Sequence, residues 1–504
     1  MRSIGRCCAA AVVAVCVTVT VACGRTANRP PVSSTVASPT SSTATSAPTV
    51  ISEPVVPEGD FRPVAQLVND AIAVPRLPGA VVQIGHGGNV VFRQAFGVRK
   101  YPGEPGLYGV STPAEPMTED TLFDLASLSK ILATTTALLQ LYEQGKVDVD
   151  APLERYLPEF NPTHDPRRAE VTLRMVLTHT SGIAGDLSHD GPWGLTAADK
   201  EDGIRRALNA RVEFNPGEIF HYSDIGFILL GTIVERISGQ TLDVYAHEHI
   251  FIPLGMTDTH YLPATKACGP HRTIGNALAI EPGPTVTDCP AGTWNTDLLR
   301  RVAPTALDED TPGINPDIGR PLRGTVHDPT ARRMGGVAGS AGVFSTVHDV
   351  GRYLQALLDR LAGRPSTFPL KQSTLEMMTT PQQPGHHPGQ VEAANVATRE
   401  AMANRPNVAD PLLAPDYPAI PGQNLRGFGW DIDTPHSRPR GMVFPIGSVG
   451  HTGFTGVTLW ADPGSDTYVV VLGNVIHQRG GPPIVKLSGD IATTAARSLH
   501  LYGS

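Results

Sequence analysis

The chain has 504 residues, and its 40 Lys and Arg residues against 48 Asp and Glu residues give a formal net charge of −8. A chain of this length can bury a large core, either as one two-lobed domain or as two to three smaller ones. The weakly negative charge, without a long basic run, argues against a nucleic-acid-binding protein. The 51 Gly and 46 Pro residues indicate many turns rather than a helical bundle.

The N-terminus has the pattern of a targeting segment. Arg2 and Arg6 precede a run of about 15 apolar residues, which is short for a membrane-spanning helix and typical of a signal peptide. Small residues before Cys23 resemble a bacterial lipoprotein cleavage site, although Thr20 stands where leucine is usual. We expect a lipoprotein signal peptide over residues 1–22, lipidation of Cys23, and anchoring on the extracytoplasmic face of the membrane. Ordinary secretion with a slightly later cleavage is the alternative.

The next segment, residues 23–58, is dominated by Pro, Ser, Thr and Val and carries little charge. It shows neither helical nor strand periodicity and cannot bury a core, so it is predicted to be a disordered linker. Residues 59–504 are then expected to form the folded domain.

The cysteines agree with export. Four of the six lie at or before Cys23, which leaves Cys268 and Cys289 in the folded region. In an oxidising compartment these two are expected to form a disulfide, which closes a loop of about 20 residues and adds roughly 3 kcal/mol of stability in the chain-entropy model. Two buried free thiols are the alternative.

Hydrophobic periodicity predicts strands near both ends of the domain and helices between them. A Gly-Gly-Asn turn joins residues 80–84 and 90–97 in a β-hairpin. Helices are expected at 127–144, 171–179, 200–209, 225–237, 242–249, 347–361 and 484–499, and strands at 427–432, 443–449, 456–461 and 467–472. This order implies an α/β fold of the α+β type, with one sheet built from both chain ends and a helical lobe inserted at roughly 140–335. Residues 380–423 are predicted to form a long loop or insertion.

Ser127 and Lys130 are the most informative residues of the chain. The two residues are separated by three positions at the start of a predicted helix. Their side chains therefore project from the same face of the helix, one turn apart. This spacing places an amine beside a serine hydroxyl, as a serine nucleophile requires when an amine manages its proton. Only Lys130 among the lysines has a serine three residues before it. Taken alone, the pair is better explained by a helix cap followed by a solvated lysine.

Three later segments supply what this pair lacks. Tyr222 lies just before a predicted helix, where its phenol can project from a loop. The segment 450–456, which contains His451, lies on a predicted strand late in the chain. The run of small residues at 335–346 leads into the final sheet.

The motifs occur in the order Ser-x-x-Lys, Tyr-Ser-x about 95 residues later, and His-Thr-Gly near the C-terminus. In this order the chain resembles the serine β-lactamases of class C, the penicillin-binding DD-peptidases and related esterases. Residues 177–182, 215–217 and 253–256 are further matches, and the resemblance covers roughly residues 60–500. It implies a β-lactamase/transpeptidase-like fold, in which an antiparallel sheet flanked by helices faces a second, all-helical lobe across the site.

The resemblance also implies a role for each motif residue. Ser127 is the expected nucleophile, which attacks a carbonyl to form an acyl-enzyme. Lys130, buried between two lobes, is either partly deprotonated or charged, and Tyr222 can act as a general base or pass a proton to the leaving group. Which of the two takes the proton first stays open. No metal ion or other cofactor is expected.

The oxyanion hole is expected to consist of the backbone N–H groups of Ser127 and Phe454. The family's hole uses the nucleophile's own amide and that of the residue after the His-Thr-Gly glycine. Each such donor is worth about 3 kcal/mol in the transition state. Gly453 lets the extended backbone approach the acyl group, and Thr452 and Asp224 are counted with the substrate-binding residues.

Three residues depart from the family pattern. His451 stands where β-lactamases usually carry lysine, so any positive charge that it offers a substrate carboxylate is expected to depend on pH near 6.5. Asp224 replaces the common asparagine after Tyr-Ser and puts an anion beside the site. Phe454 replaces a small hydroxyl residue that often helps to hold a carboxylate. Together these differences weaken the case for efficient β-lactam hydrolysis and leave peptidase and esterase activities open.

Other candidate sites are weaker. His247 and His249 lack the i, i+4 spacing of a helical zinc site and are expected on a solvated helix face. His386 lies in a Pro/Gly loop without supporting ligands. His179 and His327 match family segments and are assigned structural hydrogen-bonding roles.

The sequence therefore predicts an exported serine hydrolase, a DD-carboxypeptidase-like enzyme that forms an acyl-enzyme on Ser127, acts on cell-envelope peptides and is a weak β-lactamase at most. A carboxylesterase of the same group is the alternative. A non-catalytic envelope-binding lipoprotein is disfavoured because Ser127, Lys130, Tyr222 and His451 are all present. The expected partners are a small peptide, ester or β-lactam substrate and, through the lipid anchor, the membrane.

Overall fold

The structure, a computed structural model, describes residues 53–504 with the exception of 57, 75–76, 308–318, 404–423 and 478–483. The expected signal peptide, Cys23 and all but a few residues of the expected linker lie outside the described residues. Within the described part of the chain, no helix has both the length and the apolar character needed to cross a bilayer.

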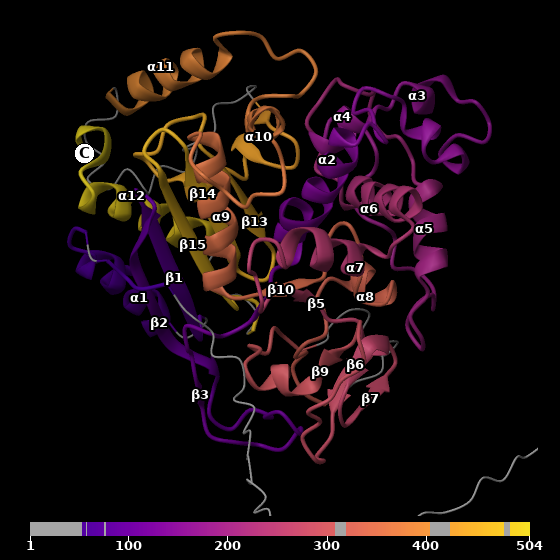
Figure 1. The fold of residues 1–504 in the computed structure, drawn as a ribbon, viewed down its shortest axis with the longest axis vertical. Helices are drawn as coiled ribbons and strands as arrows, with labels where there is room; N and C mark the ends of the chain where they lie inside the picture. Colours follow the sequence, from indigo (N-terminus) through magenta and orange to yellow (C-terminus); the bar gives the residue numbers. More distant parts are fainter. Residues whose placement is uncertain (1–52, 57, 75–76, 308–318, 404–423, 478–483) are drawn as a thin grey trace, which may run out of the picture. The chain divides into compact units, whose positions relative to one another are not determined.

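The described domain is organised around one large antiparallel sheet (Figure 1). Its eight strands run in the order β11 (Leu425–Arg426), β12 (Asp431–Asp433), β13 (Val449–Gly453), β14 (Val457–Asp462), β15 (Thr467–Gly473), β1 (Gly79–His86), β2 (Asn89–Lys100) and β3 (Glu115–Pro116). The N-terminal hairpin meets the C-terminal strands where β1 pairs with β15, with Val82 opposite Val471. The expectation of one sheet built from both chain ends is therefore confirmed.

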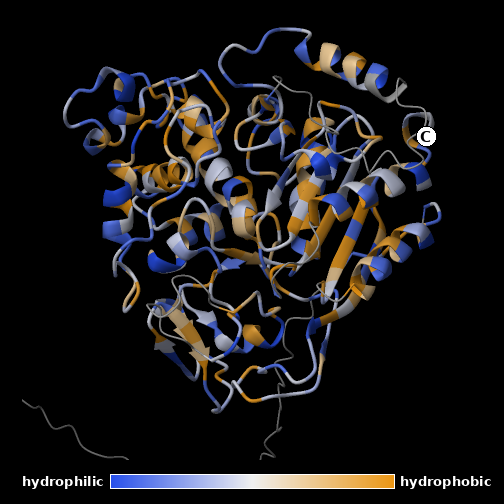
Figure 2. Cartoon of the chain, turned by 180° about the vertical axis from the view of Figure 1, so that it is seen from behind, coloured by the Kyte–Doolittle hydropathy of each residue, from blue (hydrophilic) through white to orange (hydrophobic). Residues whose placement is uncertain are grey.

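Side-chain alternation along the strands puts the two faces of this sheet against different cores. On β1, Val81 belongs to one hydrophobic cluster and Val82 to the other. Helices α1 (Arg62–Ala73) and α12 (Ile484–Ser498) contribute to the core that contains Val82, and α9 (Val347–Leu361) contributes to the core that contains Val81. The central strands are hydrophobic along much of their length because both faces are covered (Figure 2).

A mostly helical segment is inserted between the two halves of the sheet. Its central helix, α6 (Asp224–Ser238), is apolar on almost every side and is buried over most of its length. The neighbouring helices are α2 (Thr136–Glu143), α3 (Pro166–Ala169), α4 (Leu173–Leu177), α5 (Lys200–Leu208) and α7 (Leu242–Ala246). The segment also contains the short strands β5 (His260–Tyr261), β6 (Ala267–Cys268), β7 (His271–Ile274), β8 (Ala277–Ile280) and β9 (Trp294–Asn295), so it is not helical throughout.

The disulfide lies in the part of this insertion that contains short strands. Strands β6 and β9 pair in parallel. Cys268, at the end of β6, is joined to Cys289, with Cα atoms 5.8 Å apart and a sequence separation of 21. The two cysteines of the folded region thus form the predicted bond.

Two of the strands expected in the C-terminal part of the chain lie at other positions. The strand expected at 443–449 does not form, because residues 441–448 make turns around Pro445, and the strand begins at Val449 instead. The strand expected at 427–432 forms only from Asp431, where β12 begins, because residues 427–430 make a turn that the Gly427 N–H closes on the Trp430 carbonyl (3.0 Å). The segment 380–423 contains helix α11 (Gln390–Ala403), and its residues 404–423 lie outside the described part.

Candidate active site

Ser127 and Lys130 lie at the start of the buried helix that leads into α2. Ser127 belongs to a 3-10 turn, Ala126–Leu128, and a π-helical turn, Lys130–Thr135, follows it. The Lys130 side chain is fully buried, and its Nζ donates hydrogen bonds to Ser127 Oγ (2.9 Å) and to the Ser340 carbonyl oxygen (3.0 Å). The expected contact between hydroxyl and amine is therefore present.

Asp124, which the sequence did not single out, shapes the backbone before Ser127. It lies on β4 (Phe123–Asp124), and its carboxylate accepts the Ala126 N–H (2.9 Å) and the His327 N–H (2.7 Å). Ala126 adopts φ 45°, a left-handed conformation that is unfavourable for alanine. Burial raises the pKa of Asp124 to about 6 despite these hydrogen bonds. The carboxylate thus helps to hold a strained turn that presents Ser127.

The small-residue run at 335–346 brings a carbonyl group to Lys130. A Cβ atom at Gly339 would lie 2.0 Å from the Phe227 carbonyl oxygen, so only glycine permits this close packing against α6. Thr134 Oγ1 donates to the Gly339 carbonyl (2.8 Å), which fixes the run on the helix after Ser127. The next carbonyl, that of Ser340, then accepts the Lys130 hydrogen bond.

Tyr222 and Asp224 approach the same lysine from the start of α6. Ser223 caps this helix, because its side chain accepts the Gly226 N–H (3.0 Å). Asp224 forms an ion pair with Lys130. Lys130 Nζ lies 5.1 Å from the Tyr222 ring centroid, and the Tyr222 phenol interacts with both Ser127 and Lys130. Hydroxyl, amine, phenol and carboxylate are therefore brought together.

These contacts decide the charge of Lys130 and Tyr222. Burial, the largest single effect, lowers the pKa of Lys130, but Asp224 and Tyr222 together raise it by more, so the net shift is upward and the side chain is an ammonium. Burial raises the pKa of Tyr222, and the Lys130 charge only partly offsets this, so the phenol is neutral. Neither group is a ready base in the resting site.

Two further carboxyl groups interact electrostatically with the lysine. Asp328 caps α8 (Pro329–Arg333) by accepting the Ala331 N–H (2.7 Å), and burial together with the Asp224 charge raises its pKa to about 6. Loss of hydration and the neighbouring Asp224 raise the pKa of Asp186 to about 7. Asp328 follows His327 in a segment that matches the family, but neither Asp328 nor Asp186 was singled out from the sequence.

The expectation for the charge of His451 is wrong. The ring lies on β13, almost fully buried, and its Nδ1 forms a hydrogen bond with the Thr452 carbonyl (2.8 Å). Burial, followed by the positive charges of Arg426 and Lys130, lowers its pKa well below the ordinary histidine value. The imidazole is therefore neutral at neutral pH and offers no positive charge to a substrate carboxylate.

The end of β13 packs against the segment that carries Ser127. A Cβ atom at Gly453 would lie 2.8 Å from the Leu125 carbonyl oxygen, and Thr455 Oγ1 donates to the Asp124 carbonyl (2.7 Å). Between them, Phe454 is 73% exposed, and its ring stacks on that of His327, with centroids 6.0 Å apart. The two backbone amides expected to bind an oxyanion thus belong to segments that are in contact, with half-buried Thr452 beside them.

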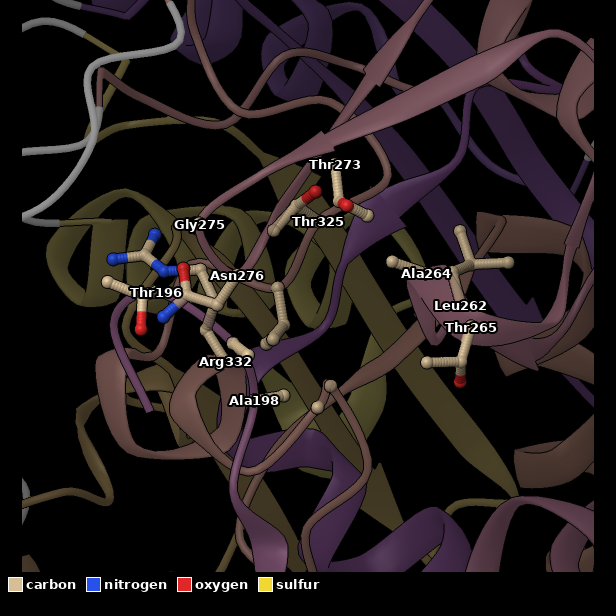
Figure 3. Close-up of a pocket in the computed structure, with 14 residues that line it drawn as sticks. Thr196, Ala198, Leu262, Ala264, Thr265, Thr273, Gly275, Asn276, Thr325 and Arg332 are labelled. Carbon is tan, nitrogen blue, oxygen red and sulfur yellow. The ribbon is translucent and has the colours of Figure 1, made fainter. Parts of the chain in front are cut away.

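A cavity of about 260 Å³ lies beside α8 and is lined by Thr196, Thr273, Asn276, Thr325 and Arg332, among others (Figure 3). None of the four motif side chains lines it. Within the described part of the chain, no cluster of histidine, cysteine and acidic side chains is placed to hold a metal ion.

Replacing Asp224 by asparagine is expected to shift the pH dependence of the reaction. The Asp224 charge raises the pKa of both Lys130 and Tyr222, so its removal lowers both and leaves more of the base unprotonated at a given pH. The acidic limb of the kcat/KM profile should therefore move to lower pH. The ratio of kcat/KM at about pH 6 to that at about pH 9 should rise by about tenfold.

The control for this experiment is Asp202→Asn on α5, where the carboxylate pairs with Arg206 at the surface (2.8 Å). Its pH profile should coincide with that of the wild type. An acidic limb that Asp224→Asn leaves in place would show that neither Lys130 nor Tyr222 supplies the titrating base.

Comparison with known proteins agrees with this arrangement. The family model described as Beta-lactamase matches residues 64–481. The chain is 28% identical over 425 residues to "N-acetylmuramyl-L-alanine amidase" of Bacillus subtilis (strain 168), covering 83% of this chain and 81% of that protein. It is also 28% identical over 404 residues to "Putative D-alanyl-D-alanine carboxypeptidase" of Escherichia coli (strain K12), covering 78% of this chain and 77% of that protein.

The fold is also that of solved structures. The octameric penicillin-binding protein homologue from Pyrococcus abyssi superposes with a TM-score of 0.55 at 20% sequence identity, covering 88% of this chain and 78% of that chain. At this identity the likeness concerns the fold alone. Because the family model spans most of the chain, the protein belongs to the Beta-lactamase family of serine hydrolases.

Proposed function

We propose that the protein hydrolyses amide bonds of cell-envelope peptides through an acyl-enzyme on Ser127, in the manner of a DD-carboxypeptidase. The observation that carries this proposal is the 2.9 Å contact between Lys130 Nζ and Ser127 Oγ, with the Tyr222 ring centroid 5.1 Å from the same Nζ. A serine hydroxyl needs such a partner, because its own proton must leave as it attacks a carbonyl.

In the proposed reaction, Ser127 Oγ bonds to the substrate carbonyl carbon and its proton passes to the Tyr222–Lys130 pair. The backbone amides of Ser127 and Phe454 hold the oxyanion, and each is worth about 3 kcal/mol in the transition state. The bond to the leaving nitrogen then breaks as this nitrogen receives the proton. Water attacks the acyl-enzyme by the same route in reverse and returns a proton to Ser127.

The names of two relatives support an envelope amide as substrate. One is called an N-acetylmuramyl-L-alanine amidase and the other a putative D-alanyl-D-alanine carboxypeptidase, and each shares 28% identity with most of this chain. We further propose that residues 1–22 direct export and that lipidated Cys23 anchors the enzyme on the outer face of the membrane, where such substrates occur.

Carboxylesterase activity is the second candidate, favoured by the charges around Ser127. A peptidase acting at a C-terminal residue needs a cation for the substrate carboxylate. His451 is neutral, however, and Lys130 is already paired with Asp224. The exposed Phe454 ring suits an apolar group instead.

One set of assays separates these candidates. The purified protein is offered a peptide ending in D-Ala-D-Ala, p-nitrophenyl acetate, and a fluorescent penicillin followed by a denaturing gel. We expect D-alanine release and a penicillin adduct that is absent from Ser127→Ala. Ester turnover without either result would identify an esterase. A penicillin label retained in Ser127→Ala would contradict the assignment of the nucleophile.

A further inference from the structure

His179 follows α4 in an unusual backbone conformation. Its φ is 55°, in the left-handed region, and its side chain is completely buried. Such a conformation is uncommon for residues other than glycine and persists only where the surroundings enforce it. The function proposed above gives no role to this residue.

His179 contacts the residues before and after Tyr222 as well as the Tyr222 ring. The His179 carbonyl accepts the N–H of His221, the residue before Tyr222 (2.7 Å). Its Nδ1 accepts the N–H of Ser223, the residue after Tyr222 (3.0 Å). The imidazole also stacks on the Tyr222 ring, with centroids 4.2 Å apart and an angle of 24° between the planes.

The hydrogen bond to Ser223 determines the tautomer of the imidazole. Because Nδ1 accepts a hydrogen bond from the Ser223 N–H, a neutral ring carries its own proton on Nε2. Burial, followed by the positive charges of Arg426 and Lys130, lowers the pKa of His179 well below the ordinary value. The Nδ1 acceptor is therefore available at any pH at which the enzyme would work.

We propose that His179 is the positioning residue of Tyr222, holding its two flanking peptide groups and its ring so that the phenol stays directed at Ser127 and Lys130. This inference rests on the proposed function, because it presumes that Tyr222 transfers the proton. A displacement of about 1 Å in a reacting group can cost on the order of 100-fold in rate, so a group that fixes the tyrosine from three directions should affect kcat.

The test compares His179→Ala with His179→Asn. Alanine removes the ring stack and the Nδ1 acceptor, and we expect kcat to fall by about 10- to 100-fold with KM changed by less than about threefold. Asparagine tolerates a positive φ, and its Oδ1 takes the place of Nδ1 as the acceptor for Ser223. We expect it to restore most of the lost kcat.

His436→Ala is the matched control. The His436 ring also contacts the Tyr222 ring, at 5.3 Å and tilted by 43°, but the structure gives its side chain no hydrogen bond to either flanking peptide group. Loss of the His436 ring should lower kcat by less than about threefold. Melting temperatures of all variants show whether each is folded.

A double variant separates positioning from general support of the fold. If His179 acts through Tyr222, adding His179→Ala to Tyr222→Phe should lower kcat no further. An equal loss in both backgrounds, or a wild-type kcat in His179→Ala, would overturn the inference. Full activity of Tyr222→Phe alone would instead show that the proposed function assigns the wrong proton carrier, and the inference would fall with it.

Discussion

The Ser127→Ala variant is expected to form no acyl-enzyme and to lose kcat by a factor on the order of 10⁶, as when a serine nucleophile is removed from a unit of cooperating groups. Without Oγ no ester to the enzyme can form, and neither Lys130 nor Tyr222 can replace it. Steady-state kinetics and the intact mass after incubation with substrate or penicillin check this. A variant with a residual acyl adduct would place the nucleophile elsewhere.

Steady-state kinetics of Lys130→Met test whether Lys130 and Ser127 act in the same catalytic step or contribute independently. Methionine fills most of the buried volume but removes the amine that contacts Ser127 Oγ. If the two groups act as a unit, as proposed, the double variant with Ser127→Ala should be no slower than Ser127→Ala alone. Lys200→Ala is the control, since Lys200 pairs with Glu235 at the partly exposed side of α6 and should leave kcat within about twofold. Additive losses would contradict a shared role.

Asp433→Ala is expected to lower the free energy of unfolding by about 3–5 kcal/mol. Asp433 and Arg440 are both fully buried. The guanidinium donates to the Asp433 carboxylate (2.9 Å) and to the Ile432 carbonyl (2.8 Å). Removal of the carboxylate leaves a buried cation without this counter-charge.

Denaturant unfolding measures the effect of Asp433→Ala. Asp60→Ala, which breaks an exposed pair with Arg62, is the control and should leave unfolding unchanged. Replacing both buried partners, as in Asp433→Leu with Arg440→Met, should recover much of the loss, because neither charge of this pair remains. A loss below about 1 kcal/mol in Asp433→Ala would show that water or other groups compensate the arginine.

The sequence by itself determined the features that depend on local spacing. Two apolar, strand-like runs joined by a Gly-Gly-Asn turn located the hairpin of β1 and β2, and the Ser-x-x-Lys spacing placed Ser127 and Lys130 one turn apart, as the 2.9 Å contact confirms. The order of the motifs indicated the family. Prediction failed where turn residues interrupt an apolar run, as at 443–449, because local hydrophobicity there does not reveal where the chain bends.

Only the tertiary structure decided the electrostatics of the site. Lys130 donates a hydrogen bond to the carbonyl oxygen of Ser340, which lies 210 residues away in the sequence, and it forms an ion pair with Asp224. The pKa of a side chain depends on burial and on charges from such distant segments, and no local pattern encodes them. His451 is neutral for this reason, and Asp328 could not be singled out although it lies near the same lysine. Spacing along the chain therefore located the pair of Ser127 and Lys130, and long-range packing set the protonation state of Lys130.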